Sequence, residues 1–119
     1  VKSIRDLYQD KKITAIFQPH LYTRTRDFYK EFADSLSLLD EVILVDIYPA
    51  REQPIPGVTS QLIYDNLRPG IEKCMCRKED ILNLLSQKKI EVLITLGAGD
   101  IDNYVPEITK QLKLRILHS

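Results

Sequence analysis

The sequence predicts an α/β fold: a mostly parallel, open, Rossmann-like sheet with helices on both faces, built as a single domain. Short apolar runs rich in β-branched residues alternate with segments whose apolar residues recur at helical spacing. Alternation along a whole chain is typical of strand–helix–strand crossovers, which keep the strands parallel. The length of 119 residues fits one core, because two domains of that total size would each bury little apolar surface.

Three segments have the composition of buried strands, and they span residues 13–17, 41–47 and 90–96. Two shorter segments are further candidates: residues 73–76, and residues 115–117 as an edge strand. A last helix is expected over residues 101–112, after four earlier helical patterns. The apolar residues of those four patterns are Ile4, Leu7 and Tyr8; Phe28, Phe32, Ala33, Leu36 and Leu39; Leu62, Ile63 and Leu67; and Ile81, Leu82, Leu84 and Leu85.

Composition excludes several classes of protein. Seventeen Lys and Arg balance 17 Asp and Glu, so no overall field attracts nucleic acid or anionic lipid. The longest apolar runs, such as residues 42–45 and 92–96, fall far short of the roughly 20 residues of a membrane span. Charged residues from Lys2 onward interrupt the start, so no signal peptide is expected. Two Cys without a disulfide framework fit a reducing, cytoplasmic location.

The loop after the first strand carries the main candidate site, because parallel strands end at one edge, where such sheets bind ligands. Arg24 and Arg26 lie where the next helix is expected to begin. A cation there is unfavourable by roughly 0.3–1 kcal/mol, which indicates a nearby anion. Free backbone N–H groups, the guanidinium groups and the imidazole of His20 would hold a carboxylate or phosphate, with Tyr22 beside them.

An alternative assigns this loop no ligand. In that interpretation Thr23 or Thr25 caps the helix, and the two Arg side chains face solvent or pair with Asp27 and Glu31. His20 would then be a buried, hydrogen-bonded histidine. Both interpretations stay open at the level of residue pattern.

The loop after the second strand, residues 48–60, contains three Pro and a Gly, so it is stiff. A stiff loop loses little entropy on binding and can form a pocket wall or an interdomain surface. Tyr48 and Glu52 are its candidate ligand-facing residues. The alternative is a rigid connector in which Thr59 or Ser60 caps the next helix.

The loop after the residue 90–96 strand, Gly97-Ala98-Gly99-Asp100, does not complete a dinucleotide-binding motif, because the third glycine position falls on Asp102. Tight packing with Asp100 as a helix cap explains it equally well. Cys74, Cys76 and the two His lack the spacing of a zinc site. No catalytic residue, cofactor contact or metal ligand is therefore predicted in this chain.

Three segments together resemble the carboxyl-terminal domain of the Mur ligase family, in the same order and spacing. They are F-Q-P-H-L-Y-T-R-T-R-D at residues 17–27, Y-P-A-R-E-Q-P-I-P-G at residues 48–57 and L-G-A-G-D-I at residues 96–101. The resemblance covers nearly the whole chain, and the first two segments are specific to the family. It implies that residues 1–119 are one domain of a three-domain enzyme.

The resemblance implies a cytoplasmic enzyme of peptidoglycan synthesis that joins L-alanine to UDP-N-acetylmuramic acid while cleaving ATP. In this family ATP activates the muramoyl carboxylate as an acyl phosphate, which the amine then attacks. The amino-terminal domain holds the UDP-sugar, the central domain holds ATP and magnesium, and the carboxyl-terminal domain brings the amino acid. The family's G-T-x-G-K-T phosphate loop is absent here, so the fragment is expected to be inactive alone.

By motif position, the family residues that hold the alanine carboxylate fall on His20 and Arg24. Leu21 stands where many members carry Arg, which leaves Arg26 or Tyr22 to compensate. Tyr48 and Glu52 would lie near the interdomain cleft. Two alternatives remain: a related ligase that adds a tripeptide or another amino acid, and a non-catalytic α/β module that binds an anion or a protein.

Overall fold

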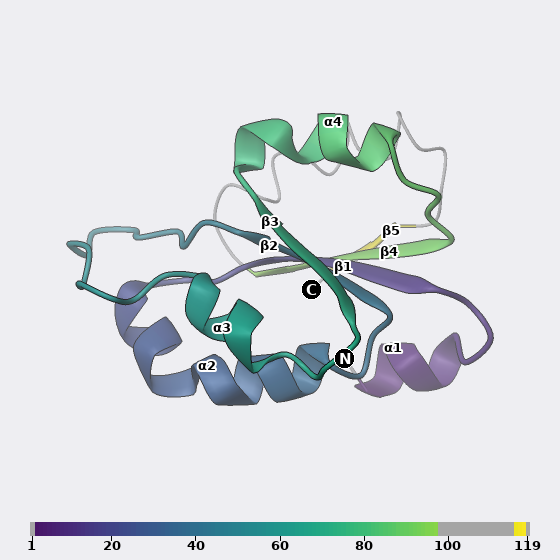
Figure 1. The fold of residues 1–119 in the computed structure, drawn as a ribbon, viewed down its shortest axis with the longest axis horizontal. Coiled ribbons are helices and arrows are strands. Elements are labelled where there is room, and N and C mark those ends of the chain that lie inside the picture. Colours follow the sequence, from purple (N-terminus) through teal and green to yellow (C-terminus); the bar gives the residue numbers. More distant parts are fainter. Residues whose placement is uncertain (1, 98–115, 119) are drawn as a thin grey trace.

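The structure is a computed structural model that describes residues 2–97 and 116–118. Its centre is one parallel sheet of five strands in the order β3-β2-β1-β4-β5 (Figure 1). The strands are β1 (Ile13–Gln18), β2 (Glu41–Val45), β3 (Glu72–Cys76), β4 (Val92–Gly97) and β5 (Ile116–His118). The predicted α/β fold with a parallel sheet is confirmed, including both short candidate strands.

The helices are α1 (Lys2–Leu7), α2 (Tyr22–Leu36), α3 (Gln61–Asn66) and α4 (Ile81–Ser86), with a 3-10 turn η1 (Lys78–Asp80) before α4. Figure 1 shows α2 and α3 on one side of the sheet and α4 on the other, so both faces are covered as predicted. The helix expected over residues 101–112, and the turn that follows Gly97, lie outside the described residues.

The core has two parts because successive side chains of a strand point to opposite faces. On one face Phe17 and Leu44 pack against residues of α2 and α3 such as Leu36. On the other face Ile43 packs against residues of α4 such as Leu85. Each fully buried aliphatic side chain contributes roughly 1.5–3 kcal/mol, so the alternating strands anchor helices on both sides.

The sheet reverses its direction of growth at β1. The chain adds β2 and β3 on one side of β1, and then β4 and β5 on the other. Gln18 pairs with Gly97 where β1 and β4 end, which places their carboxyl ends side by side. In open α/β sheets the crevice at such a reversal is where ligands bind. The fold therefore points to this carboxyl edge.

A buried ionic cluster holds the opposite, amino edge together. The carboxylate of Glu41 is 2% exposed and accepts hydrogen bonds from Lys88 Nζ at 2.6 Å and Thr14 Oγ1 at 3.1 Å. Lys12 Nζ lies 3.8 Å from the same carboxylate and 3.1 Å from Glu72. The hydrogen bond to Glu41 raises the pKa of Lys88. This cluster joins three strands to the segment between α4 and β4.

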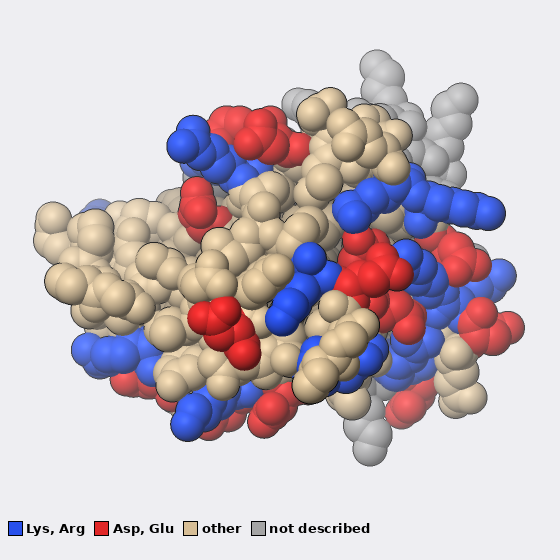
Figure 2. Space-filling model, in the orientation of Figure 1, with Lys and Arg blue, Asp and Glu red and all other residues tan. Residues whose placement is uncertain are grey.

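Charged side chains are unevenly distributed over the surface. Figure 2 shows Lys and Arg interspersed with Asp and Glu, most densely toward the right of the view, where Figure 1 places the start of β1. The opposite end, where the loop between β2 and α3 projects, is mostly uncharged in this view. The balanced charge therefore does not form a single-sign field on this face.

Replacing Lys88 by Met should destabilise the chain by about 2 to 3 kcal/mol. The loss is smaller than the roughly 3–5 kcal/mol of a fully buried pair, because Lys12 remains near the Glu41 carboxylate. Urea unfolding measures the difference, with Lys89→Met as the matched control at an exposed neighbouring position. Equal unfolding midpoints for the two variants would contradict a stabilising role of the Lys88 pair.

Candidate functional site

Two loops at the carboxyl edge are joined by backbone pairing that continues past the ends of β1 and β2. His20 and Tyr48 form an isolated parallel bridge. The N–H of Tyr48 donates to the carbonyl of Pro19 at 2.8 Å, and the N–H of Leu21 donates to the carbonyl of Tyr48 at 2.9 Å. The rings of His20 and Tyr48 stack with centroids 5.8 Å apart. Two predicted site residues are thus brought together.

The start of α2 differs from the prediction. The helix begins at Tyr22, and its N-cap residue is Leu21, so the expectation that Thr23 or Thr25 caps it is wrong. Thr25 instead donates its hydroxyl back to the carbonyl of Leu21 at 2.9 Å. Leu21 has a φ of 72°, a strained value for a side chain of this size. Its own side chain offers no acceptor to the helix.

Glu52 supplies that acceptor from the other loop. Its Oε1 accepts the N–H of Tyr22 at 2.6 Å and the N–H of Thr23 at 3.1 Å. Its Oε2 accepts the hydroxyl of Thr23 at 2.6 Å. These hydrogen bonds, led by that from the Thr23 hydroxyl, lower the pKa of Glu52. The prediction that these first N–H groups are free for an external anion is therefore wrong, because the chain's own carboxylate occupies them.

The two arginines that motivated the anion hypothesis differ in their surroundings. Arg26 is exposed and pairs with its neighbour Asp27, Nε to Oδ1 at 2.9 Å, as the alternative interpretation had it. This hydrogen bond raises the pKa of Arg26 and lowers the pKa of Asp27. Arg24 is exposed, and its guanidinium lies 5.6 Å from the centroid of the Phe28 ring. Within the described part of the chain no carboxylate pairs with Arg24.

A small pocket of about 150 Å³ opens beside Tyr48 at the same edge. Its polar lining includes Gln18, Asp46 and Lys78. The sequence pattern alone does not mark these residues as site residues. The signal that could have found them is position, because Gln18 ends β1, and Asp46 and Lys78 lie one and two residues after the ends of β2 and β3. Tyr48 therefore borders both this pocket and His20.

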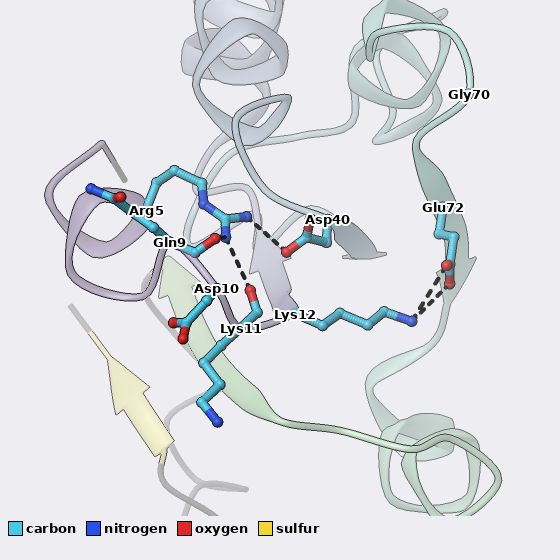
Figure 3. A pocket seen from close by; sticks show the side chains of 8 residues that line it. All are labelled: Arg5, Gln9, Asp10, Lys11, Lys12, Asp40, Gly70 and Glu72. Atoms are coloured by element: carbon cyan, nitrogen blue, oxygen red, sulfur yellow. Dashed lines mark hydrogen bonds and ion pairs between the residues drawn. The ribbon is translucent and has the colours of Figure 1, made fainter.

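A larger, open pocket of about 430 Å³ lies at the amino edge (Figure 3). Its charged groups are largely engaged with one another: Arg5 binds Asp40 at 2.7 Å, and Lys12 binds Glu72 at 3.1 Å. Since these pairs satisfy most of the charged groups, the pocket offers a ligand little that water does not. The carboxyl edge remains the candidate functional site.

The sequence is similar to segments of known enzymes, although no protein family model matches it. The UDP-N-acetylmuramate–L-alanine ligase of Phocaeicola vulgatus is 83% identical over 108 residues, which cover 91% of this chain. Enzymes of the same name from Parabacteroides distasonis and Flavobacterium johnsoniae are 53% and 47% identical, over 94% and 97% of this chain. The chain belongs to the UDP-N-acetylmuramate–L-alanine ligase family. The resemblance drawn from the three segments is confirmed.

The chain spans about a quarter of the length of these ligases: 24% of the first two and 25% of the third. It is thus a fragment of a ligase of this family. The sequence of 119 residues contains no G-x-x-x-x-G-K-[S/T] loop for nucleotide phosphates. Among the described residues no three His, Cys, Asp or Glu side chains form a metal site, and no helix is long and apolar enough to cross a membrane.

The two thiols of this ligase segment are free and half-buried on β3. Both pack on the side of the sheet that α4 covers. Burial raises the pKa of both, and that of Cys76 reaches about 11. Because the thiolate is the reactive form of cysteine, this environment favours a packing role.

Cys76 should therefore react slowly with iodoacetamide. At pH 8 a thiol of pKa about 11 is roughly one-thousandth ionised, against roughly a quarter for an ordinary thiol, so labelling should be about 250-fold slower than in the urea-unfolded chain. Peptide mass spectrometry measures both rates. Similar rates in the folded and unfolded chain would contradict a protected thiol.

Proposed function

We propose that this chain is the amino-acid-binding, closing carboxyl-terminal domain of an ATP-dependent ligase that joins L-alanine to UDP-N-acetylmuramic acid. The reaction would take place in the cytoplasm and serve peptidoglycan synthesis. Through the cell wall it would also serve cell shape and cell division. The identity to ligases of this name supports the proposal. Its central structural support is the junction at the carboxyl edge, where His20 meets Tyr48 while Arg24 stays unpaired among the described residues.

The proposed role of Arg24 is to bind the carboxylate of L-alanine. Its guanidinium presents several N–H donors in the planar arrangement that a carboxylate accepts. His20 lies just before α2 and adds a second donor, and its ring stacks on the partly buried Tyr48. Tyr22 is the first residue of α2 and is also partly buried. A charge-assisted contact of this kind contributes roughly 1.5–3 kcal/mol, which suits a small substrate of weak affinity.

The remaining parts of the reaction are assigned to the segments outside this chain. The central domain would hold ATP and magnesium, and the amino-terminal domain would hold the UDP-sugar. The absence of a phosphate loop here supports that division, and it supports the expectation that the isolated chain is inactive. Domain closure would bring the amine of L-alanine to the activated muramoyl carboxylate and exclude water from it.

Arg24→Ala in the full-length ligase should raise the KM for L-alanine by roughly 10- to 100-fold, the equivalent of one lost charge-assisted contact. The KM for ATP should change less than twofold, because ATP is bound elsewhere. Steady-state kinetics with each substrate varied in turn measures both constants.

Lys30→Ala is the matched control, since it removes an exposed cation from the same helix. An unchanged KM for L-alanine in Arg24→Ala would refute the role of Arg24. A preference of the unmodified enzyme for a tripeptide or another amino acid over L-alanine would overturn the proposed substrate and favour a related ligase instead.

A further inference from the structure

We propose that Glu52 is a positioning residue that locks the loop after β2 onto the start of α2 and thereby aims His20 and Arg24 at the substrate. The inference rests on the function proposed for this edge and deepens it. The sequence pattern predicts Glu52 as a ligand-facing residue, whereas in the structure its carboxylate accepts hydrogen bonds from the protein itself. In this role Glu52 acts through the backbone of α2 and does not touch L-alanine.

The first support is the number and shortness of the contacts. One carboxylate takes three donors from Tyr22 and Thr23, two of them at 2.6 Å, across about 30 residues of sequence. Hydrogen bonds to an ionised acceptor are the stronger kind, and a negative charge is favoured at a helix N-terminus. We call these three contacts the Glu52 clamp. Arg24 is the residue that follows Thr23, so the clamp lies immediately beside the proposed carboxylate-binding residue.

The second support is the rigidity of the loop that carries Glu52. The N–H of Glu52 donates to the carbonyl of Pro49 at 2.9 Å, which closes a turn through Ala50 at a φ of 53°. At the far end of the loop the hydroxyl of Ser60 donates to the carbonyl of Val45 at 2.6 Å. The carboxylate is thus held by backbone fixed on both sides. A clamp built on a rigid loop can orient what it holds.

The third support is electrostatic. Because Glu52 occupies the first N–H groups of α2, a substrate carboxylate placed there would meet a like charge. Arg24 carries no such competitor among the described residues, since its guanidinium lies over Phe28. The clamp therefore also sets where the anion binds: on the Arg24 side chain and away from the helix terminus.

The strained backbone at this junction fits the same role. Among the described residues the two non-glycine residues with positive φ are Leu21 and Ala50. Leu21 directly precedes α2, and Ala50 lies in the turn that presents Glu52. Strain of this kind persists where the surroundings over-determine the backbone. Here the bridge between His20 and Tyr48, together with the hydrogen bonds of Glu52, holds the backbone in these strained conformations.

The test uses the full-length ligase with Glu52→Gln, and Thr23→Val as a milder variant that removes the hydroxyl donor while keeping the side-chain shape. Glu31→Gln is the control, because it neutralises an exposed glutamate farther along the same helix. Two quantities are measured for each protein: hydrogen exchange of the peptide that contains Tyr22 and Thr23, and the kinetic constants for L-alanine and ATP.

We expect exchange at the start of α2 to become about tenfold faster in Glu52→Gln, and the KM for L-alanine to rise about tenfold with the KM for ATP unchanged. Thr23→Val should change both quantities in the same direction by a smaller factor, and Glu31→Gln should change neither. The effect of Arg24→Ala on the KM for L-alanine should be smaller in the Glu52→Gln background, because a misaligned Arg24 already contributes less to binding.

Three outcomes would overturn the inference. A raised KM with unchanged exchange would make Glu52 a direct ligand contact, and an effect of Glu52→Gln without any effect of Thr23→Val would indicate the same. Unchanged exchange together with unchanged kinetics would show that Glu52 neither stabilises the start of α2 nor affects substrate binding. Faster exchange in an enzyme that does not use L-alanine would leave the clamp standing and refute the proposed function, so the two failures are distinguishable.

Discussion

The geometry of the carboxyl edge depends on one interaction, the acceptance of the first N–H groups of α2 by the carboxylate of Glu52. A helix leaves its first N–H groups without partners inside the helix, and its N-terminus favours a negative charge. This protein satisfies both needs with a side chain from another loop. Two segments that are 30 residues apart in sequence thereby become one surface, on which His20, Tyr48 and Arg24 have defined positions.

The two edges of the sheet divide stability and binding between them. At the amino edge, Glu41 is buried and paired with Lys88, and most charges of the pocket there form two further ion pairs, Arg5 with Asp40 and Lys12 with Glu72. At the carboxyl edge, Arg24 has no carboxylate partner among the described residues, and non-glycine residues adopt strained backbone angles. Charges that are already paired hold strands together, whereas an unpaired cation at a strained junction is suited to an external anion.

Strand positions and the two-sided core followed from the sequence because they depend on local composition and on the alternation of side chains. The start of α2 did not follow. A local rule favours Thr23 or Thr25 as the cap, but the carboxylate of Glu52, about 30 residues away, binds the start of the helix instead. The periodicity of the sequence does not predict a contact over that separation. The Arg26 pair with Asp27 is local and was foreseen as an alternative, whereas Gln18 and Asp46 beside the small pocket were not.

The most direct test of this account is a crystal structure of the full-length ligase with L-alanine bound. We expect the alanine carboxylate within about 3 Å of the Arg24 guanidinium, with Glu52 still bound to the N–H groups of Tyr22 and Thr23. An alanine carboxylate seated on those N–H groups in place of Glu52, or bound in the pocket at the amino edge, would contradict it.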